Sequence, residues 1–299
     1  MKITIATPTF GKSHYLKECI DSVCDQSLTT LHIICGGNLS IDEKITEENV
    51  RVMNQEIDPG MVKCWGMAAS LAETEYIGFL ADDNSLQSGF SERMVSFLEN
   101  YPACDLVFCN QYHMDSKGQI DLGKTKAFTI QFGRDLLPEG IIDERYYRIM
   151  LEKGAMPLEA CIIRKNLWDL YGPFKTNARG AFDHEFLYRI LLDKRKIGFI
   201  PEYLMNFRWH DASYSSKKKE DHIIGAIWAY ESLMVNSNKY HDIFKMKSVF
   251  LKGRLLRYNI PSRDRINIIK TLIAEENGLK YIFKNSIIRI LSRIKFWKE

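Results

Sequence analysis

The sequence lacks several features that would assign a class directly. It contains no uninterrupted apolar run of 18 residues, so no membrane-spanning helix is expected. It has no long apolar segment with a small-residue cleavage site at its start, so we expect no secretory signal and a fold that begins at residue 1. Internal repeats and low-complexity segments are also missing. Without a GxSxG elbow, an HExxH pair or a P-loop, hydrolase, zinc-protease and kinase functions have no support.

Paired cysteines are missing too. The seven cysteines are odd in number, and none forms a close CxxC pair of the zinc-ribbon or thioredoxin type. Because disulfides persist mainly in oxidising compartments, we interpret these cysteines as reduced and the protein as cytoplasmic.

Charge is unevenly distributed along the 299 residues. The chain has a formal net charge of +3, yet residues 245–299 hold 14 Lys and Arg against 4 Asp and Glu. That segment therefore carries +10, and residues 1–244 carry −7. Since most of the chain is acidic, nucleic-acid binding is disfavoured.

Short apolar, β-branched runs alternate with helical periodicity over the first two thirds of the chain. The runs predict strands at 2–7, 31–35, 50–53, 76–80, 105–110, 159–164 and 198–201. Helices are expected at 13–26, with Ser13 as its N-cap, and at 61–72, 89–100, 183–194 and from 222 onward, whereas 119–145 is expected to be irregular. This alternation indicates an α/β fold, a mainly parallel sheet covered by helices on both faces.

Three polar constellations follow predicted strands or begin a helix, where ligands bind in such sheets. Asp82 and Asp83 follow a buried strand and suit a divalent cation and a diphosphate, although acidic pairs after strands are often solvated turn residues. Asp183 begins an amphipathic helix and is either a helix-start acid or a general base, with Glu185 as a secondary candidate. His210, in the segment Arg208–Ser213, is either a surface histidine or a ligand of the metal or a phosphate.

In their order and spacing these pieces resemble the inverting family 2 glycosyltransferases, which have the GT-A fold. The resemblance covers roughly residues 1–215 and rests on the combination of four segments. They are Ile3–Tyr15 (ITIATPTFGKSHY), Asp58–Asn84 (DPGMVKCWGMAASLAETEYIGFLADDN), Gly172–Arg189 and Phe207–Ser213.

The resemblance implies a role for each matching position. It places a DxD-like metal carboxylate at Asp83, the catalytic base at Asp183, and His210 and Ser213 in a loop that closes near the diphosphate. Asp83 and His210 are the predicted metal ligands. Together with the constellations above, it leads to the predicted nucleotide-sugar residues Thr7, Pro8, Thr9, Gly36, Lys63, Asp82, Asp83, His210 and Ser213. Mn²⁺ or Mg²⁺ is the implied cofactor.

Several positions depart from the family pattern. Gly11 stands where relatives usually carry Asn, and Cys35 stands where an Asp commonly contacts the base. Ala81 occupies the first DxD position, and Lys63 and Gly66 replace an Asp and an Asn. These losses of acid weaken the metal inference more than the fold, whereas Lys63 offers a positive charge to a diphosphate.

The C-terminal segment has the composition of an interfacial helix. Apolar and aromatic side chains alternate with basic ones there: Lys284, Ile287, Ile288, Arg289, Ile290, Leu291, Arg293, Ile294, Lys295, Phe296, Trp297 and Lys298. Such a helix binds anionic lipid on the inner face of the cytoplasmic membrane. Packing against the catalytic domain or a second subunit, in a homo-oligomer, is the alternative.

Taken together, the sequence predicts a catalytic domain over 1–220, with a nucleotide-sugar half at 1–115 and an acceptor half at 116–220, and a helical extension over 221–299. The predicted function is inverting sugar transfer to a glycan acceptor, lipid-linked if the tail binds membrane, in bacterial surface polysaccharide synthesis. The resemblance implies a UDP- or dTDP-linked donor. A degenerate glycosyltransferase-fold scaffold or glycan-binding subunit is the non-enzymatic alternative. A nucleotidyltransferase is less favoured, because PTFGKSHY is a poor match to a Gly-rich phosphate loop.

Overall fold

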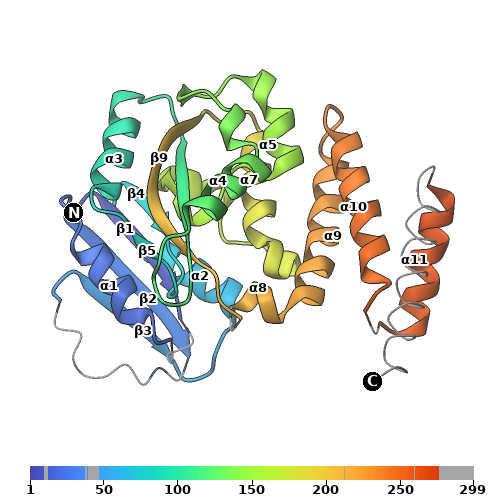
Figure 1. Cartoon of the computed structure of the whole chain (residues 1–299), viewed down its shortest axis with the longest axis horizontal. Coiled ribbons are helices and arrows are strands. Elements are labelled where there is room, and N and C mark those ends of the chain that lie inside the picture. Colours follow the sequence, from blue (N-terminus) through green and yellow to red (C-terminus); the bar gives the residue numbers. More distant parts are fainter. Residues whose placement is uncertain (10–12, 38, 40–46, 212, 259, 276–299) are drawn as a thin grey trace. The chain divides into compact units, whose positions relative to one another are not determined.

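The computed structural model describes residues 1–9, 13–37, 39, 47–211, 213–258 and 260–275 (Figure 1). These fall into two compact units. The first unit comprises Met1–Thr176 and Phe186–Ser213, and the second comprises Asn177–Glu185 and the chain from Tyr214 onward. The functional division at residue 220 stays a prediction.

The first unit is built on one mixed sheet. Its strands are β1 (Ile3–Pro8), β2 (Thr30–Gly37), β3 (Val50–Gln55), β4 (Tyr76–Phe79), β5 (Ser85–Leu86), β6 (Leu106–Met114), β7 (Gly140–Ile141), β8 (Cys161–Arg164) and β9 (Ile197–Arg208). Their order is β3-β2-β1-β4-β8-β6-β9-β5, with β7 also paired to β9. The strands β1, β2, β3, β4, β6 and β9 all run in one direction, because β8 is antiparallel to both β4 and β6. Their carboxyl ends therefore share one edge.

Helices cover both faces of this sheet (Figure 1). The helices that reach the first unit are α1 (Leu16–Cys24), α2 (Met61–Ser70), α3 (Phe90–Asn100), α4 (Leu122–Gln131), α5 (Tyr147–Lys153), α6 (Lys165–Tyr171) and α7 (Phe182–Leu192), whose first residues belong to the second unit. Short 3-10 turns lie at Arg134–Leu136, Glu144–Tyr146, Leu158–Ala160 and Thr176–Ala181.

Each sheet face has its own apolar layer. On one face, Cys19 and Val23 of α1 and Met94 and Leu98 of α3 join side chains such as Ile5 in a buried cluster. The opposite face is aromatic and joins β4 to α2, α6 and α7 through the rings of Phe79, Trp65, Trp168, Phe174 and Phe186. The predicted α/β architecture, with a mainly parallel sheet between helices, is confirmed.

The predicted irregular stretch 119–145 is wrong, since α4 occupies its middle. Asp121 caps α4 by accepting a hydrogen bond from the Lys124 amide at 2.9 Å. Thr125 faces inward and is buried, whereas Leu122 is 69% exposed and Ile130 is 52% exposed. Because the polar face of this helix is the buried one, hydrophobic periodicity could not reveal it.

Two other local expectations also differ from the structure. Ser13 is not the N-cap of α1, because Tyr15 occupies that position without a capping side chain, and the Ser13 hydroxyl instead accepts from the Tyr15 amide at 3.3 Å. The strand expected at 198–201 continues to Arg208. It does so despite Pro201, because the register shifts there and Asn110 donates its side-chain amide to the Pro201 carbonyl at 2.9 Å.

The second unit is helical, with α8 (Tyr214–Lys217), α9 (Lys219–Val235), α10 (His241–Leu255) and α11 (Ser262–Ala274). Helices α9, α10 and α11 share an apolar cluster that includes Ile223, Val249 and Leu272. The segment interpreted as membrane-binding lies within 276–299, outside the described residues. Within the described part of the chain, no helix is both long and apolar enough to span a bilayer.

Candidate active site

Polar residues converge at the edge where the six codirectional strands end. Thr9 follows β1, and its amide donates to the Cys35 carbonyl of β2 at 2.8 Å. Asp82 and Asp83 follow β4, and Arg208 ends β9. This is the edge at which open α/β sheets bind ligands, because the loops diverge there and leave a crevice.

Thr9 and Asp82 join the ends of β1 and β4. The Thr9 hydroxyl donates to Asp82 Oδ2 at 2.5 Å. Gly36 at the end of β2 leaves room for this loop, since a Cβ at Gly36 would lie 2.3 Å from the Thr9 carbonyl oxygen. The structure thus brings three of the predicted nucleotide-sugar residues together and gives Gly36 a packing reason for being glycine.

Asp83 and His210 form the second pair. His210 Nε2 lies 2.9 Å from Asp83 Oδ2, and the two side chains are 13% and 21% exposed. Tyr15 packs beside the imidazole, with ring centroids 5.2 Å apart. Ser213 closes a turn behind them, its amide donating to the His210 carbonyl at 3.2 Å. Both predicted metal ligands are therefore within reach of one ion.

Arg208 holds this arrangement from beneath. Its side chain is 1% exposed and donates to the Asp83 carbonyl at 2.8 Å, to the Asp115 carbonyl at 3.3 Å and to Glu18 Oε2 at 2.5 Å. The guanidinium also lies 4.2 Å from the ring centre of Tyr15. One buried cation thus joins the ends of β4, β6 and β9 to α1.

Glu159 performs a similar task on the other side of the loop. Its Oε2 accepts from the Ala81 amide at 2.8 Å and from the Asn84 side chain at 2.6 Å. Asn84 in turn accepts from the Arg208 amide at 2.7 Å. The turn that carries Asp83 is therefore held from both flanks before any ligand arrives, which reduces the ordering cost of binding.

Thr7 points into the protein instead of toward the edge. It is fully buried, and its hydroxyl lies 2.8 Å from His32 Nε2. Burial lowers the pKa of His32 to about 3, so the ring is neutral in the folded protein. The predicted role of Thr7 at the nucleotide base therefore has no side-chain hydroxyl available, and Pro8 lies in β1 beside Cys35.

Because His32 is buried in its neutral form, we expect the free energy of unfolding to decrease in acid. A free histidine takes up a proton below about pH 6.5, whereas His32 does so only near pH 3, so stability should fall as the pH drops through that window by about 1.4 kcal/mol per pH unit. The replacement His32→Gln keeps a polar partner for Thr7 and removes the titration. Urea unfolding at pH 7 and pH 5 should show a smaller difference in the variant than in the wild type. Equal differences would exclude His32 as the source.

Lys63 and the two acids near the start of α7 complete the predicted set. Lys63 is exposed in the first turn of α2, which follows Gly60. Asp183 and Glu185 lie in the first turn of α7 and belong to the second unit. Asp183 Oδ1 is buried and accepts no hydrogen bond from the described residues, and Glu185 is 2% exposed.

Asp83 and His210 suit a metal ion whose remaining coordination positions are filled by a bound ligand. Asp83 offers a carboxylate oxygen and His210 an imidazole nitrogen, a mixed pair that Mn²⁺ accepts more readily than Mg²⁺ does. No group of three metal-ligating side chains occurs among the residues that the structure describes. Phosphate and water oxygens would therefore have to fill most of the coordination sphere.

Three residues that hold the candidate site together were not identified from the sequence: Arg208, Glu18 and Glu159. The sequence shows Arg208 only as the neighbour of His210, and Glu18 and Glu159 stand in no motif. Glu18 and Arg208 are 190 residues apart. No local pattern identifies an ion pair of that separation.

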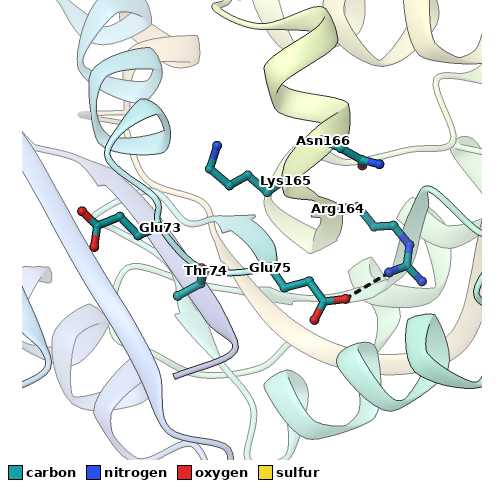
Figure 2. Close-up of a pocket in the computed structure, with 6 residues that line it drawn as sticks. All are labelled: Glu73, Thr74, Glu75, Arg164, Lys165 and Asn166. Atoms are coloured by element: carbon teal, nitrogen blue, oxygen red, sulfur yellow. Dashed lines mark hydrogen bonds and ion pairs between the residues drawn. The ribbon is translucent and has the colours of Figure 1, made fainter.

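A surface pocket of about 460 Å³ lies at the opposite edge of the sheet, before β4 and after β8 (Figure 2). Arg164 and Lys165 line it, and both side chains have partners. Arg164 donates to Glu75 and to the Leu98 carbonyl, and Lys165 pairs with Asp169. With both cations engaged and none of the predicted site residues present, this pocket carries no functional assignment.

Comparison with known proteins agrees with the fold. Residues 4–184 match the model described as glycosyl transferase family 2. Among curated proteins, the glycosyltransferase GlyG of Streptococcus pneumoniae serotype 4 is 24% identical over 251 residues, 80% of each chain. A poly(ribitol-phosphate) beta-glucosyltransferase of Bacillus spizizenii is 23% identical over 96% of this chain, which spans 45% of that protein.

Solved structures give the same result for the fold. S. aureus TarS in complex with UDP-GlcNAc superposes with a TM-score of 0.63 at 14% identity, covering 91% of this chain and 80% of that one. The mannosyltransferase PcManGT of Pyrobaculum calidifontis, in complex with GDP-Man and Mn²⁺, gives a TM-score of 0.60 at 11% identity over 99% and 82% of the two chains. At these identities the likeness establishes the GT-A architecture alone.

Proposed function

Because this chain belongs to glycosyl transferase family 2, we propose that it is an inverting hexosyltransferase that moves a sugar from a nucleoside-diphosphate sugar to a glycan hydroxyl. The observation that carries this proposal is the pair Asp83 and His210, 2.9 Å apart at the strand-end edge beside Thr9 and Asp82. A preorganised set of this kind suits a nucleoside diphosphate with a divalent cation.

The proposed reaction is a single in-line displacement. Asp183 accepts the proton of the acceptor hydroxyl while that oxygen forms a bond to the anomeric carbon. The bond from that carbon to the diphosphate oxygen breaks, and the nucleoside diphosphate leaves with the electron pair. Inversion follows, because the new bond forms opposite the one that breaks. A cation held by Asp83 and His210 would offset the negative charge of the departing diphosphate.

Similarity supports the proposed donor and pathway. The TarS structure contains UDP-GlcNAc, which supports a uridine or thymidine diphosphate donor, whereas PcManGT with GDP-Man supports a guanosine one. The poly(ribitol-phosphate) beta-glucosyltransferase supports a role in bacterial surface polysaccharide synthesis. Attachment of the tail to an anionic membrane, next to a lipid-linked acceptor, is proposed on composition alone.

Titration calorimetry tests the donor site. Nucleoside diphosphates and nucleotide sugars are titrated into the protein with and without Mn²⁺, and one nucleotide should bind in a metal-dependent way. Asp83→Asn should weaken that binding at least as much as loss of an outer-shell partner does at metal sites, about 10-fold. The control Asp169→Asn, whose side chain pairs with Lys165, should bind as the wild type does.

Two other results would redirect the assignment. If nucleotide binding is unchanged both without Mn²⁺ and in Asp83→Asn, the diphosphate would be bound by Lys63 and His210 without a metal. No binding of any nucleotide would contradict the transferase and favour a scaffold or glycan-binding subunit.

A further inference from the structure

The segment that carries Asp183 is attached to helix α9. Residues Asn177–Glu185 group with the helical unit, although α7 continues from there into the first unit. We infer that α9 is the positioning element for the proposed catalytic base, and that Asp221, His222 and Gly225 set the place of Asp183. This inference rests on the proposed role of Asp183.

His222 and Gly225 hold the backbone of this segment. His222 Nδ1 lies 2.7 Å from the Gly180 carbonyl oxygen, so Nδ1 is the nitrogen that carries the proton and donates. Three residues along the same helix, a Cβ at Gly225 would lie 2.0 Å from the Ala178 carbonyl oxygen and 2.6 Å from its carbon. Positions three apart share a helix face, so one face of α9 contacts the segment at two successive points.

Asp221 holds the side chain of Arg179, the residue after Ala178. Its Oδ1 accepts from Arg179 at 2.7 Å, and its Oδ2 accepts from the Tyr214 hydroxyl at 2.6 Å. Burial and the bond to Asp221 raise the pKa of Tyr214 to about 12, so this hydroxyl keeps its proton and goes on donating. The carboxylate of Asp221 thus holds Arg179, which lies four residues before Asp183.

The segment is strained where α9 holds it. Arg179 has φ +46° and ψ −127°, a conformation that side-chain-bearing residues rarely adopt. Such a residue persists only where its surroundings over-determine it, and such residues cluster at functional sites. The three α9 contacts supply that constraint, and Asp183 follows four residues later.

Asp183 itself faces the same helix. Burial chiefly, and then the charge of Asp183, raise the pKa of the Tyr230 hydroxyl on α9. Tyr230 lies five residues beyond Gly225 and is buried. Asp183 therefore lies near enough to α9 for its charge to act on Tyr230, and the same helix contacts the backbone of its segment.

The test compares His222→Ala, His222→Asn and Gly225→Ala, with Glu231→Gln as the control. Glu231 is also on α9, but it bonds Ser248 at 2.9 Å and Lys252 at 2.6 Å on α10 and makes none of the contacts above. Turnover is measured as release of nucleoside diphosphate from the nucleotide sugar selected by calorimetry, with acceptor glycan present. Hydrogen exchange of the 177–185 peptide reports on the segment without reference to activity.

Because a misplacement of about 1 Å can cost 100-fold in rate, we expect kcat to fall about 10- to 100-fold in His222→Ala and Gly225→Ala, with the KM for donor unchanged. Exchange in 177–185 should rise in both. His222→Asn, whose amide can donate where Nδ1 does, should restore most of the turnover. Glu231→Gln should match the wild type.

The inference would be overturned if His222→Ala kept wild-type turnover, as Glu231→Gln is expected to do. It would also be overturned if both variants lost turnover equally, since that would indicate a general loosening of α9. If Gly225→Ala does not fold, the two His222 variants decide. The proposed role of Asp183 fails separately, if Asp183→Asn keeps its turnover, and the proposed function fails if the wild type releases no nucleoside diphosphate. Loss of turnover in Asp183→Asn together with wild-type behaviour of His222→Ala would overturn the inference alone.

Discussion

Asp183→Asn should abolish sugar transfer while leaving donor binding intact. The substitution preserves the shape of a side chain whose Oδ1 is buried and accepts no hydrogen bond from the described residues. Its proposed role needs a carboxylate oxygen that takes up a proton, and replacement of the carboxylate by an amide removes that capacity. General-base catalysis typically contributes about 10²- to 10⁴-fold, so kcat should fall by about 10³-fold.

The measurement pairs turnover with calorimetry of the same preparation. The donor dissociation constant should stay within about twofold of the wild-type value, a difference of less than about 0.5 kcal/mol in binding free energy. Glu185→Gln is the matched control, two residues further along α7 and fully interior. If turnover disappeared in Glu185→Gln and survived in Asp183→Asn, the base would be Glu185 and the mechanism would need revision.

Arg208→Met should destabilise the protein more than any other change at the strand-end edge. The substitution keeps the buried volume but removes donors to the Asp83 and Asp115 carbonyls and the cation that pairs with Glu18. Removing one partner of a buried ion pair costs about 3–5 kcal/mol, and Glu18 is 48% exposed, so about 3 kcal/mol is expected. Urea unfolding gives this value directly.

Arg93→Met is the control for charge removal. Arg93 also contacts two carboxylates, of Glu139 and Glu202, but on the surface, where such pairs contribute about 1 kcal/mol or less. The Arg208 variant that still folds should also bind the donor more weakly, because the Asp83 backbone loses its support. Equal loss of stability in the two variants would show that Arg208 is not the buried centre of the edge.

The order of motifs predicted the family, and the family model matching residues 4–184 confirmed it. Strand and helix periodicity placed β1 to β4 and α1 to α3 within a few residues. It failed at α4, where Thr125 and Thr129 face the sheet and apolar residues face solvent. The rule that apolar side chains lie inside is statistical, and this helix is an exception that only its tertiary setting shows.

The sequence by itself determined the fold class, the family and the acids at the strand ends, because these depend on neighbours two to four residues apart and on motif order. Only the tertiary structure decided that His210 meets Asp83, that Arg208 meets Glu18, and that Asp221, His222 and Gly225 hold the segment of Asp183. Those contacts join residues 40 or more positions apart. They depend on strand order and helix packing, which the whole chain sets through the burial of its core and no local pattern encodes.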